Sequence, residues 1–269
     1  MTITVQHLEN NVALVTISAE ASRNALSYDL MKSMSDIFDN LLNDSSIQSI
    51  VMTGTGRFFC SGADIDSFST AIDDGTIGEM VGGLTSILHP LQIKIRASEK
   101  IFGVAINGAA AGGGLGLALC ADYRVCDPNA KLAAAFFSLG LSPDGGNTWL
   151  LPRLVGTQRA KRFFFNNEIW TGQMALDYGA VDELADSEDL IHRAIEVAQR
   201  WGKWSESSRR STKQLIDAST STFMETQLEF EKLLVTNSSL TPDFAEGVSA
   251  FLEKREPRFG EENFKFGEE

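Results

Sequence analysis

The chain has 269 residues, of which 43% are hydrophobic and 22% charged, a composition too apolar for intrinsic disorder. Its formal net charge is −13, so we expect no binding to nucleic acid or to an anionic membrane surface. Residues 1–18 lack the pattern of a signal peptide, and no apolar run approaches the roughly 20 residues that span a bilayer. These features predict a cytoplasmic protein.

The N-terminal part of the chain predicts a β-hairpin followed by a helix and a further strand. Residues 3–7 and 12–18 alternate polar and apolar side chains, as strands of a hairpin do. Ser27 can cap a helix whose apolar residues fall on one face. The apolar run 47–53 then supplies a strand. A strand, helix and strand in this order favour a right-handed crossover within a parallel sheet.

The middle of the chain is less regular. Residues 63–83 show little periodicity and predict either a mobile flap over a site or an irregular surface connection, with no preference between the two. A helix is expected to continue to residue 96. Strands are predicted at residues 101–106, 123–126 and 131–134.

The last part of the chain is predominantly helical. Thr171 is a candidate cap for a helix over residues 172–178. Further helices are predicted at residues 190–201, 207–218, 223–236 and 243–254. We therefore divide the chain into a core of strands and helices, residues 1–200, which holds the site, and a C-terminal helical region, residues 201–269.

A glycine-rich segment is the strongest local motif. The turn Asn107-Gly108 leads through three alanines into Gly112-Gly113-Gly114, which open an apolar helix. Unshielded N–H groups at a helix start can stabilise a developing negative charge. Tight packing of the helix on a sheet explains the glycines equally well. The spacing matches neither the dinucleotide-binding glycine motif nor the phosphate-binding loop.

A second motif, residues 58–65, follows the predicted strand 47–53 directly. In folds that alternate strands and helices, loops after strands carry the functional site. The backbone N–H of Ala63 is therefore a candidate second donor opposite the N–H of Gly113.

Taken together, these motifs resemble the crotonase superfamily, which includes enoyl-CoA hydratases and isomerases. The resemblance implies an α/β fold, a spiral of ββα units with a C-terminal helical trimerisation region. It also implies a homotrimer or a dimer of trimers, an acyl-CoA thioester as substrate, and no separate cofactor or metal. The matching segments run in order over about 230 residues: Arg23 to Leu26, Phe59 to Ile65, Ala105 to Gly114, Ala121 to Arg124, Gly140 to Gly146 with Leu151 to Gly156, and Glu246 to Arg255.

The resemblance also implies a binding site. The oxyanion hole of the superfamily corresponds to the N–H groups of Ala63 and Gly113, which would hold the thioester oxygen while an enolate forms. Phe251 and Lys254 on the last helix are expected to reach CoA, in some relatives from a neighbouring subunit, although Lys254 reads equally well as a solvated charge. The expected CoA-binding residues are Asn24, Ala25, Ala63, Asp64, Ile65, Gly113, Phe251 and Lys254.

The departures from the family pattern favour an isomerase. Hydratases of the superfamily use two glutamates, and these positions hold Gly116 and Phe136, neither of which can exchange a proton. Asp144 occupies the position where isomerases and aroyl-CoA dehalogenases carry an aspartate, although it could instead only cap a turn. The expected substrate pocket comprises Phe136, Phe137, Gly116 and Trp149.

We therefore predict an isomerase of enoyl-CoA thioesters in the degradation of fatty or aromatic acids, with Asp144, Ala63 and Gly113 as catalytic groups. The motif after Gly140 is most similar to ring-1,2-epoxyphenylacetyl-CoA isomerases. The alternatives are hydratase-like or aroyl-CoA hydrolytic activity, and a non-catalytic acyl-CoA-binding protein. The histidine of the dehalogenases aligns near Ile93. A chemical role for His89, four residues earlier, is therefore only a minor expectation.

Overall fold

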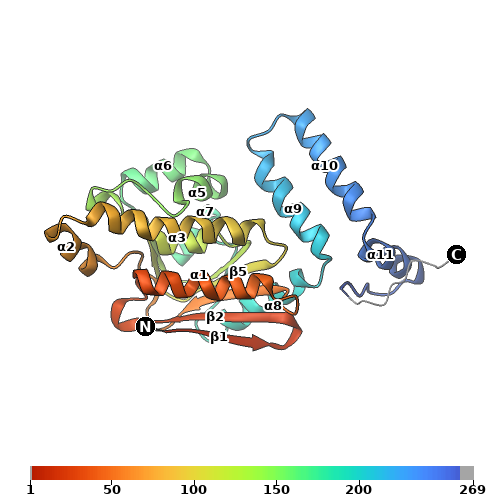
Figure 1. Cartoon of the computed structure of the whole chain (residues 1–269), viewed down its shortest axis with the longest axis horizontal. Helices are drawn as coiled ribbons and strands as arrows, with labels where there is room; N and C mark the ends of the chain where they lie inside the picture. The colour runs from red at the N-terminus through yellow and green to blue at the C-terminus, as the bar shows by residue number, and fades with distance from the viewer. Residues whose placement is uncertain (1, 261–269) are drawn as a thin grey trace.

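The computed structural model describes residues 2–260 (Figure 1). Its larger sheet has six strands in the order β1-β2-β3-β5-β7-β10. The first two strands form the predicted antiparallel hairpin, and every later pairing in this sheet is parallel. The strands are β1 (Thr2–Leu8), β2 (Val12–Ser18), β3 (Ser49–Gly54), β5 (Ile101–Ile106), β7 (Tyr123–Cys126) and β10 (Glu183–Leu184).

A smaller sheet positions the two motif loops. Its strand order is β4-β6-β8-β9, and the first three strands run parallel. Because the carboxyl ends of adjacent parallel strands meet at one edge, the segments that follow β4 and β6 emerge together. The strands are β4 (Phe58–Cys60), β6 (Ala109–Ala111), β8 (Lys131–Ala133) and the antiparallel β9 (Ile169–Thr171).

Helices cover both faces of the larger sheet (Figure 1). Alternate residues of β2 point to opposite faces, so Ala13 and Val15 join the main core while Val12 and Leu14 pack beneath α8 (Leu190–Gly202). On the main-core side lie α1 (Tyr28–Asn43) and α3 (Ile77–Ala97). Ser27 caps α1 as predicted, accepting a hydrogen bond from the Leu30 N–H at 3.3 Å.

The weakly patterned segment 63–83 is mostly helical, so the prediction of an irregular surface connection is wrong, while the mobile flap stays a prediction. It contains α2 (Ile65–Asp73), a short turn and the first residues of α3. Ala71 is the only buried residue of α2. Ile65, Phe68 and Ile72 do follow a helical spacing, but the helix is only nine residues long and is followed at once by Asp73-Asp74-Gly75, so its pattern is too short to stand out in the sequence.

The remaining helices agree with the predicted helical part of the chain. Thr171 caps α7 (Gly172–Tyr178) and accepts a hydrogen bond from the Met174 N–H at 3.2 Å. Within the described residues no helix combines the length and apolarity needed to cross a bilayer. The other helices of the core are α4 (Gly113–Leu119), α5 (Asn147–Val155) and α6 (Thr157–Phe165).

Three helices extend to one side of the core as an arm (Figure 1). They are α9 (Glu206–Ser219), α10 (Met224–Ser239) and α11 (Pro242–Glu253). Of these three helices, α9 packs against α3, and within the described chain no side chain of α10 is buried. The predicted C-terminal region contains these helices, and its last residues, 261–269, lie outside the described part.

Candidate active site

Two backbone segments meet at the edge of the smaller sheet. The Gly62 carbonyl accepts a hydrogen bond from the Leu26 N–H at 2.7 Å. This bond belongs to a parallel β-bridge between the two segments, and the N–H of the next residue, Ala63, does not take part in that hydrogen bond. Gly62 has a φ of +86°, and a Cβ atom placed on it would lie 3.4 Å from the Gly113 nitrogen. The backbone that carries Ala63 therefore runs directly beside the Gly113 N–H.

The three consecutive glycines have different structural reasons. Gly112 adopts a φ of +53°, which favours glycine. A Cβ atom on Gly114 would lie 2.3 Å from the Cys60 carbonyl oxygen, so this glycine permits close packing of helix on strand. Gly113 is the first residue of α4, where an N–H has no acceptor within the helix. The sequence offers close packing and an available N–H group as alternative reasons for the three glycines. In the structure both reasons hold, each at a different glycine.

The loop before α5 places Asp144 beside these groups. A Cβ atom on Gly145 would lie 3.3 Å from the Gly113 Cα, so the loop is in contact with the start of α4. Two buried amides fix it. Gln92 of α3 donates to the Gly145 carbonyl at 2.9 Å, and Asn147 donates to the carbonyls of Asp144 at 2.6 Å and Gly112 at 3.0 Å.

The side chain of Asp144 contacts His89 of α3. The His89 Nε2 to Asp144 Oδ1 distance is 2.6 Å, and the two side chains are 48% and 36% exposed. From the sequence a chemical role for His89 is only a minor expectation, because the position of the dehalogenase histidine falls near Ile93, one helical turn further on. Ile93 is 68% exposed and apolar, and it is His89 that reaches the aspartate. No local pattern marks this pair, because it depends on how α3 packs against the loop.

Two expected pocket residues have other roles. A Cβ atom on Gly116 would lie 2.0 Å from the Gly145 carbonyl oxygen, so Gly116 lies beneath the loop rather than along an open pocket. The ring of Phe137 packs edge-on against Phe165, with centroids 5.4 Å apart. Phe136 is buried, and its Cζ atom lies 3.9 Å from the position of a Cβ on Gly112, next to the glycine-rich turn.

The expected CoA-binding residues near the site differ in accessibility. Asn24 is fully buried, and its side chain holds the backbone of neighbouring segments, accepting from the Ala19 N–H at 2.9 Å and donating to the Phe58 carbonyl at 2.7 Å. Its amide is therefore structural and not a CoA ligand. Ala25 is also buried. By contrast, Ile65 is exposed at the start of α2, and Asp64 accepts a hydrogen bond from the Ser67 hydroxyl at 2.6 Å.

The two expected CoA contacts on the last helix lie far from this site in the single chain. Phe251 is 83% exposed, and Lys254 follows α11 with a left-handed backbone. Figure 1 places α11 and α2 at opposite ends of the long axis of the molecule. Contact of these residues with a CoA bound beside α2 of the same chain is therefore ruled out by the fold.

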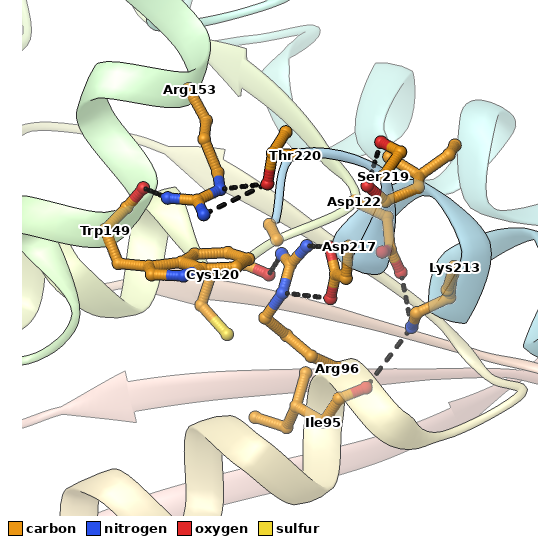
Figure 2. A network of polar contacts seen from close by, with 12 residues as sticks. Ile95, Arg96, Cys120, Asp122, Trp149, Arg153, Lys213, Asp217, Ser219 and Thr220 are labelled. Atoms are coloured by element: carbon orange, nitrogen blue, oxygen red, sulfur yellow. Dashed lines mark hydrogen bonds and ion pairs between the residues drawn. The ribbon is translucent and has the colours of Figure 1, made fainter. Parts of the chain in front are cut away.

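Trp149 belongs to a polar network that joins the core to α9 (Figure 2). The Arg153 guanidinium lies 3.6 Å from the centroid of its indole and that of Arg96 lies 5.4 Å away. Arg96 forms a two-bond ion pair with Asp217 of α9. Lys213, on the same helix, pairs with Asp122 of the core at 2.9 Å. The network fixes α9 against the core next to the indole.

The strand order, the adjoining loops after β4 and β6, and the helical arm define a protein of the crotonase fold. The chain belongs to the enoyl-CoA hydratase/isomerase family, whose model matches residues 7–262. This confirms the resemblance and the predicted fold class. A crystal structure of an enoyl-CoA hydratase from Bacillus anthracis superimposes with a TM-score of 0.89 at 28% identity, covering 96% of this chain and 99% of that one.

Curated relatives carry both kinds of activity in their names. The chain is 29% identical over 259 residues to the 1,2-epoxyphenylacetyl-CoA isomerase of Escherichia coli K12, covering 96% of this chain and 98% of that protein. It is 31% identical over 251 residues to the 2,3-dehydroadipyl-CoA hydratase of the same organism, covering 93% and 96%. Overall similarity therefore supports the family but does not distinguish an isomerase from a hydratase. That distinction depends on the residues of the site.

Proposed function

We propose that this protein is an acyl-CoA isomerase that shifts a double bond, or rearranges a ring epoxide, through an enolate. For a β,γ-unsaturated thioester, the Asp144 carboxylate takes a proton from C2 and the electron pair moves toward the thioester oxygen. The N–H groups of Ala63 and Gly113 stabilise that oxygen. Protonated Asp144 then delivers the proton to C4, giving the conjugated α,β isomer. One carboxylate is sufficient for both transfers.

One observation carries the proposal: the Gly145 backbone touches both Gly113 and Gly116. Contact with Gly113 supports a place for Asp144 beside the bound thioester. The Gly145 carbonyl also fills the space that the side chain of the first hydratase glutamate would need. Even a methyl group on Gly116 would collide with this carbonyl. The buried ring of Phe136 occupies the second position. The site thus has a base for proton transfer but lacks the pair of acids that activates water in hydratases.

A second candidate is hydrolysis, and the contact between His89 and Asp144 favours it. An imidazole oriented by a carboxylate is a general base for water in many hydrolases. Here the water would attack the thioester carbonyl carbon held by the two N–H groups, and His89 would accept its proton. The C–S bond would then break, and the CoA thiolate would leave with that proton. Phe136 stands where the dehalogenases have tryptophan, which argues against full dehalogenase chemistry.

The assembly is part of the same proposal. Within the described chain, α10 and α11 expose large apolar side chains, among them Val235, Phe251 and Leu252. Burying such a surface in a homotrimer or a dimer of trimers would remove it from water. It would also allow Phe251 and Lys254 to approach the CoA of a neighbouring subunit, which the fold of one chain does not permit.

The experiment compares wild type with Asp144→Asn on a 3-enoyl-CoA and on ring-epoxide phenylacetyl-CoA in water enriched in oxygen-18. We expect isomer products without the label, and a loss of about 10²–10⁴-fold in rate for the variant. Labelled product would instead support hydration or hydrolysis. Tight binding with no turnover and no exchange of the α-proton would support the non-catalytic alternative. Equal rates for variant and wild type would remove Asp144 from the mechanism.

A further inference from the structure

A cavity of about 680 Å³ lies between the core and α9, at the C-terminal end of α4. Its wall includes Leu119, the last residue of α4, and Ala121, which follows two residues later. None of the proposed catalytic groups, Ala63, Gly113 and Asp144, is part of the wall. The volume falls within the range of ordinary small-molecule sites. The cavity is therefore a separate space with room for a ligand of its own.

The cavity wall is basic, although the net charge of the whole chain is −13. Figure 2 shows how its two carboxylates are used, since Asp217 pairs with Arg96 and Asp122 pairs with Lys213. Arg124 pairs with Asp182, which lies outside the wall. Within the described residues the remaining two cations bond only to neutral oxygens, so the wall keeps an excess of positive charge. The five cations of the wall are Arg96, Arg124, Arg153, Arg209 and Lys213.

Arg209 of α9 is the least satisfied of these cations. Only 6% of the residue is exposed, and its Nη1 donates to the Gln48 carbonyl at 2.8 Å. Its Nε and Nη2 atoms are buried and have no hydrogen-bond partner among the described residues. Arg96 uses the same two nitrogens to hold both oxygens of the Asp217 carboxylate. Arg209 therefore offers the donor pair that matches a planar carboxylate, and a carboxylate bound there would remove the cost of two buried, unpaired donors.

The rest of the wall favours a flat, apolar body on that carboxylate. Three of the four tryptophans of the chain contribute to it, Trp149, Trp201 and Trp204. Ile101 and Ile216 add aliphatic surface. Trp204 is 46% exposed, and a ring bound in the cavity would cover part of its indole. Aromatic rings pack against an indole in stacked or edge-on arrangements, which an aliphatic chain cannot make.

We propose that this cavity is a second ligand site, which binds an aromatic carboxylate. The Nε and Nη2 groups of Arg209 hold the two carboxylate oxygens, and the ring packs against Trp201 and Trp204. The charge of Arg153, which no carboxylate of the described chain neutralises, adds attraction for the anion. The ligand is a free acid and not a thioester, because a thioester carries no charge where Arg209 requires one. The site takes no part in the proposed isomerisation and does not depend on it.

The test is calorimetric titration of the full-length protein with 2-naphthoate. We expect one molecule to bind per chain. The amide 2-naphthamide keeps the ring and loses the charge, so it should bind about tenfold more weakly or worse. Acetate keeps the carboxylate and loses the ring, and it should also bind about tenfold more weakly or worse. No binding of 2-naphthoate, equal affinity for the amide, or equally tight binding of inorganic phosphate would overturn the assignment.

Two neighbouring arginines of α9 give a matched pair of variants. Arg209→Lys keeps the charge and loses the pair of donor nitrogens, so its affinity for 2-naphthoate should fall by about tenfold or more. Arg210→Lys is the control and should bind as wild type, since Arg210 pairs with Glu99 and is not part of the cavity wall. Trp204→Ala leaves the buried cation in place and should weaken binding severalfold. Equal affinity in all four proteins, or displacement of 2-naphthoate by a saturating acyl-CoA, would contradict the proposal.

Discussion

The His89 imidazole lies 2.6 Å from the Asp144 carboxylate, joining α3 to the loop before α5. The two residues are 55 positions apart in the chain, and the side chain of each is partly exposed. The imidazole nitrogen holds one carboxylate oxygen, and in the proposed mechanism the other oxygen exchanges the proton with substrate. The contact therefore orients the proposed base, and its removal has a measurable consequence.

Replacing His89 by alanine should lower kcat by about tenfold to a hundredfold, because Asp144 loses the group that orients it. KM should change little, since His89 does not contact the expected CoA loops. His89→Gln keeps a hydrogen-bond donor and should recover part of the loss. The control is His192→Ala on α8, a side chain 73% exposed and on a different helix. A variant His89→Ala with wild-type kcat would show that the contact is incidental.

Restoring the missing hydratase glutamate should fail. In Gly116→Glu the Cβ atom would lie 2.0 Å from the Gly145 carbonyl, so the loop that carries Asp144 must move. We expect loss of isomerase activity without any gain of hydration, and the same loss in Gly116→Ala. Gly78→Ala on α3 is the control, since a Cβ there meets no atom within 4 Å. Hydration of crotonyl-CoA by Gly116→Glu would show that the site is closer to a hydratase than the structure implies.

The two amides that hold the Asp144 loop should matter for both stability and rate. Asn147→Ala removes hydrogen bonds to the buried Gly112 carbonyl and the partly buried Asp144 carbonyl, which should cost about 1–3 kcal/mol of the free energy of unfolding. Gln92→Leu removes the single bond to Gly145 and should cost less. Urea unfolding measures the stability and steady-state kinetics the rate. Full activity in Asn147→Ala at a temperature where it is folded would contradict the view that this loop must be rigid.

The stability contributed by Arg255 should depend on pH. Its guanidinium bonds to Glu246 at 2.8 Å and, together with the Arg258 N–H, lowers the pKa of that carboxyl from 4.5 to about 2. A lowered pKa stabilises the fold above the unfolded-state value and loses this effect as pH falls toward the folded one. The difference in unfolding free energy between wild type and Arg255→Gln should therefore shrink from pH 5 to pH 2. Lys232→Gln, which breaks an exposed pair, should show little difference throughout. A constant difference for Arg255→Gln would exclude the ion pair as its source.

Sequence patterns predicted six of the ten described strands and both backbone loops, because periodicity and glycine motifs are local signals. The short strands β4, β6, β9 and β10 escaped prediction, since two or three residues are too few to show an alternation. The hairpin of β1 and β2, the caps Ser27 and Thr171, and the C-terminal helices are all confirmed. Features that depend on packing between distant segments escaped prediction. The contact of His89 with Asp144 depends on the rotation of α3 about its axis. The burial of Asn24 depends on the backbone segments that meet around its side chain.

The most direct test follows one hydrogen atom. A 3-enoyl-CoA carrying deuterium at C2 is converted in ordinary water, and the product is analysed for deuterium at C4. A single carboxylate that moves the proton within a shielded site predicts that part of the label appears at C4, and that Asp144→Asn forms no labelled product. Product that forms at the wild-type rate in Asp144→Asn, or that consists of the 3-hydroxy thioester, would contradict the assignment of Asp144 as the proton carrier.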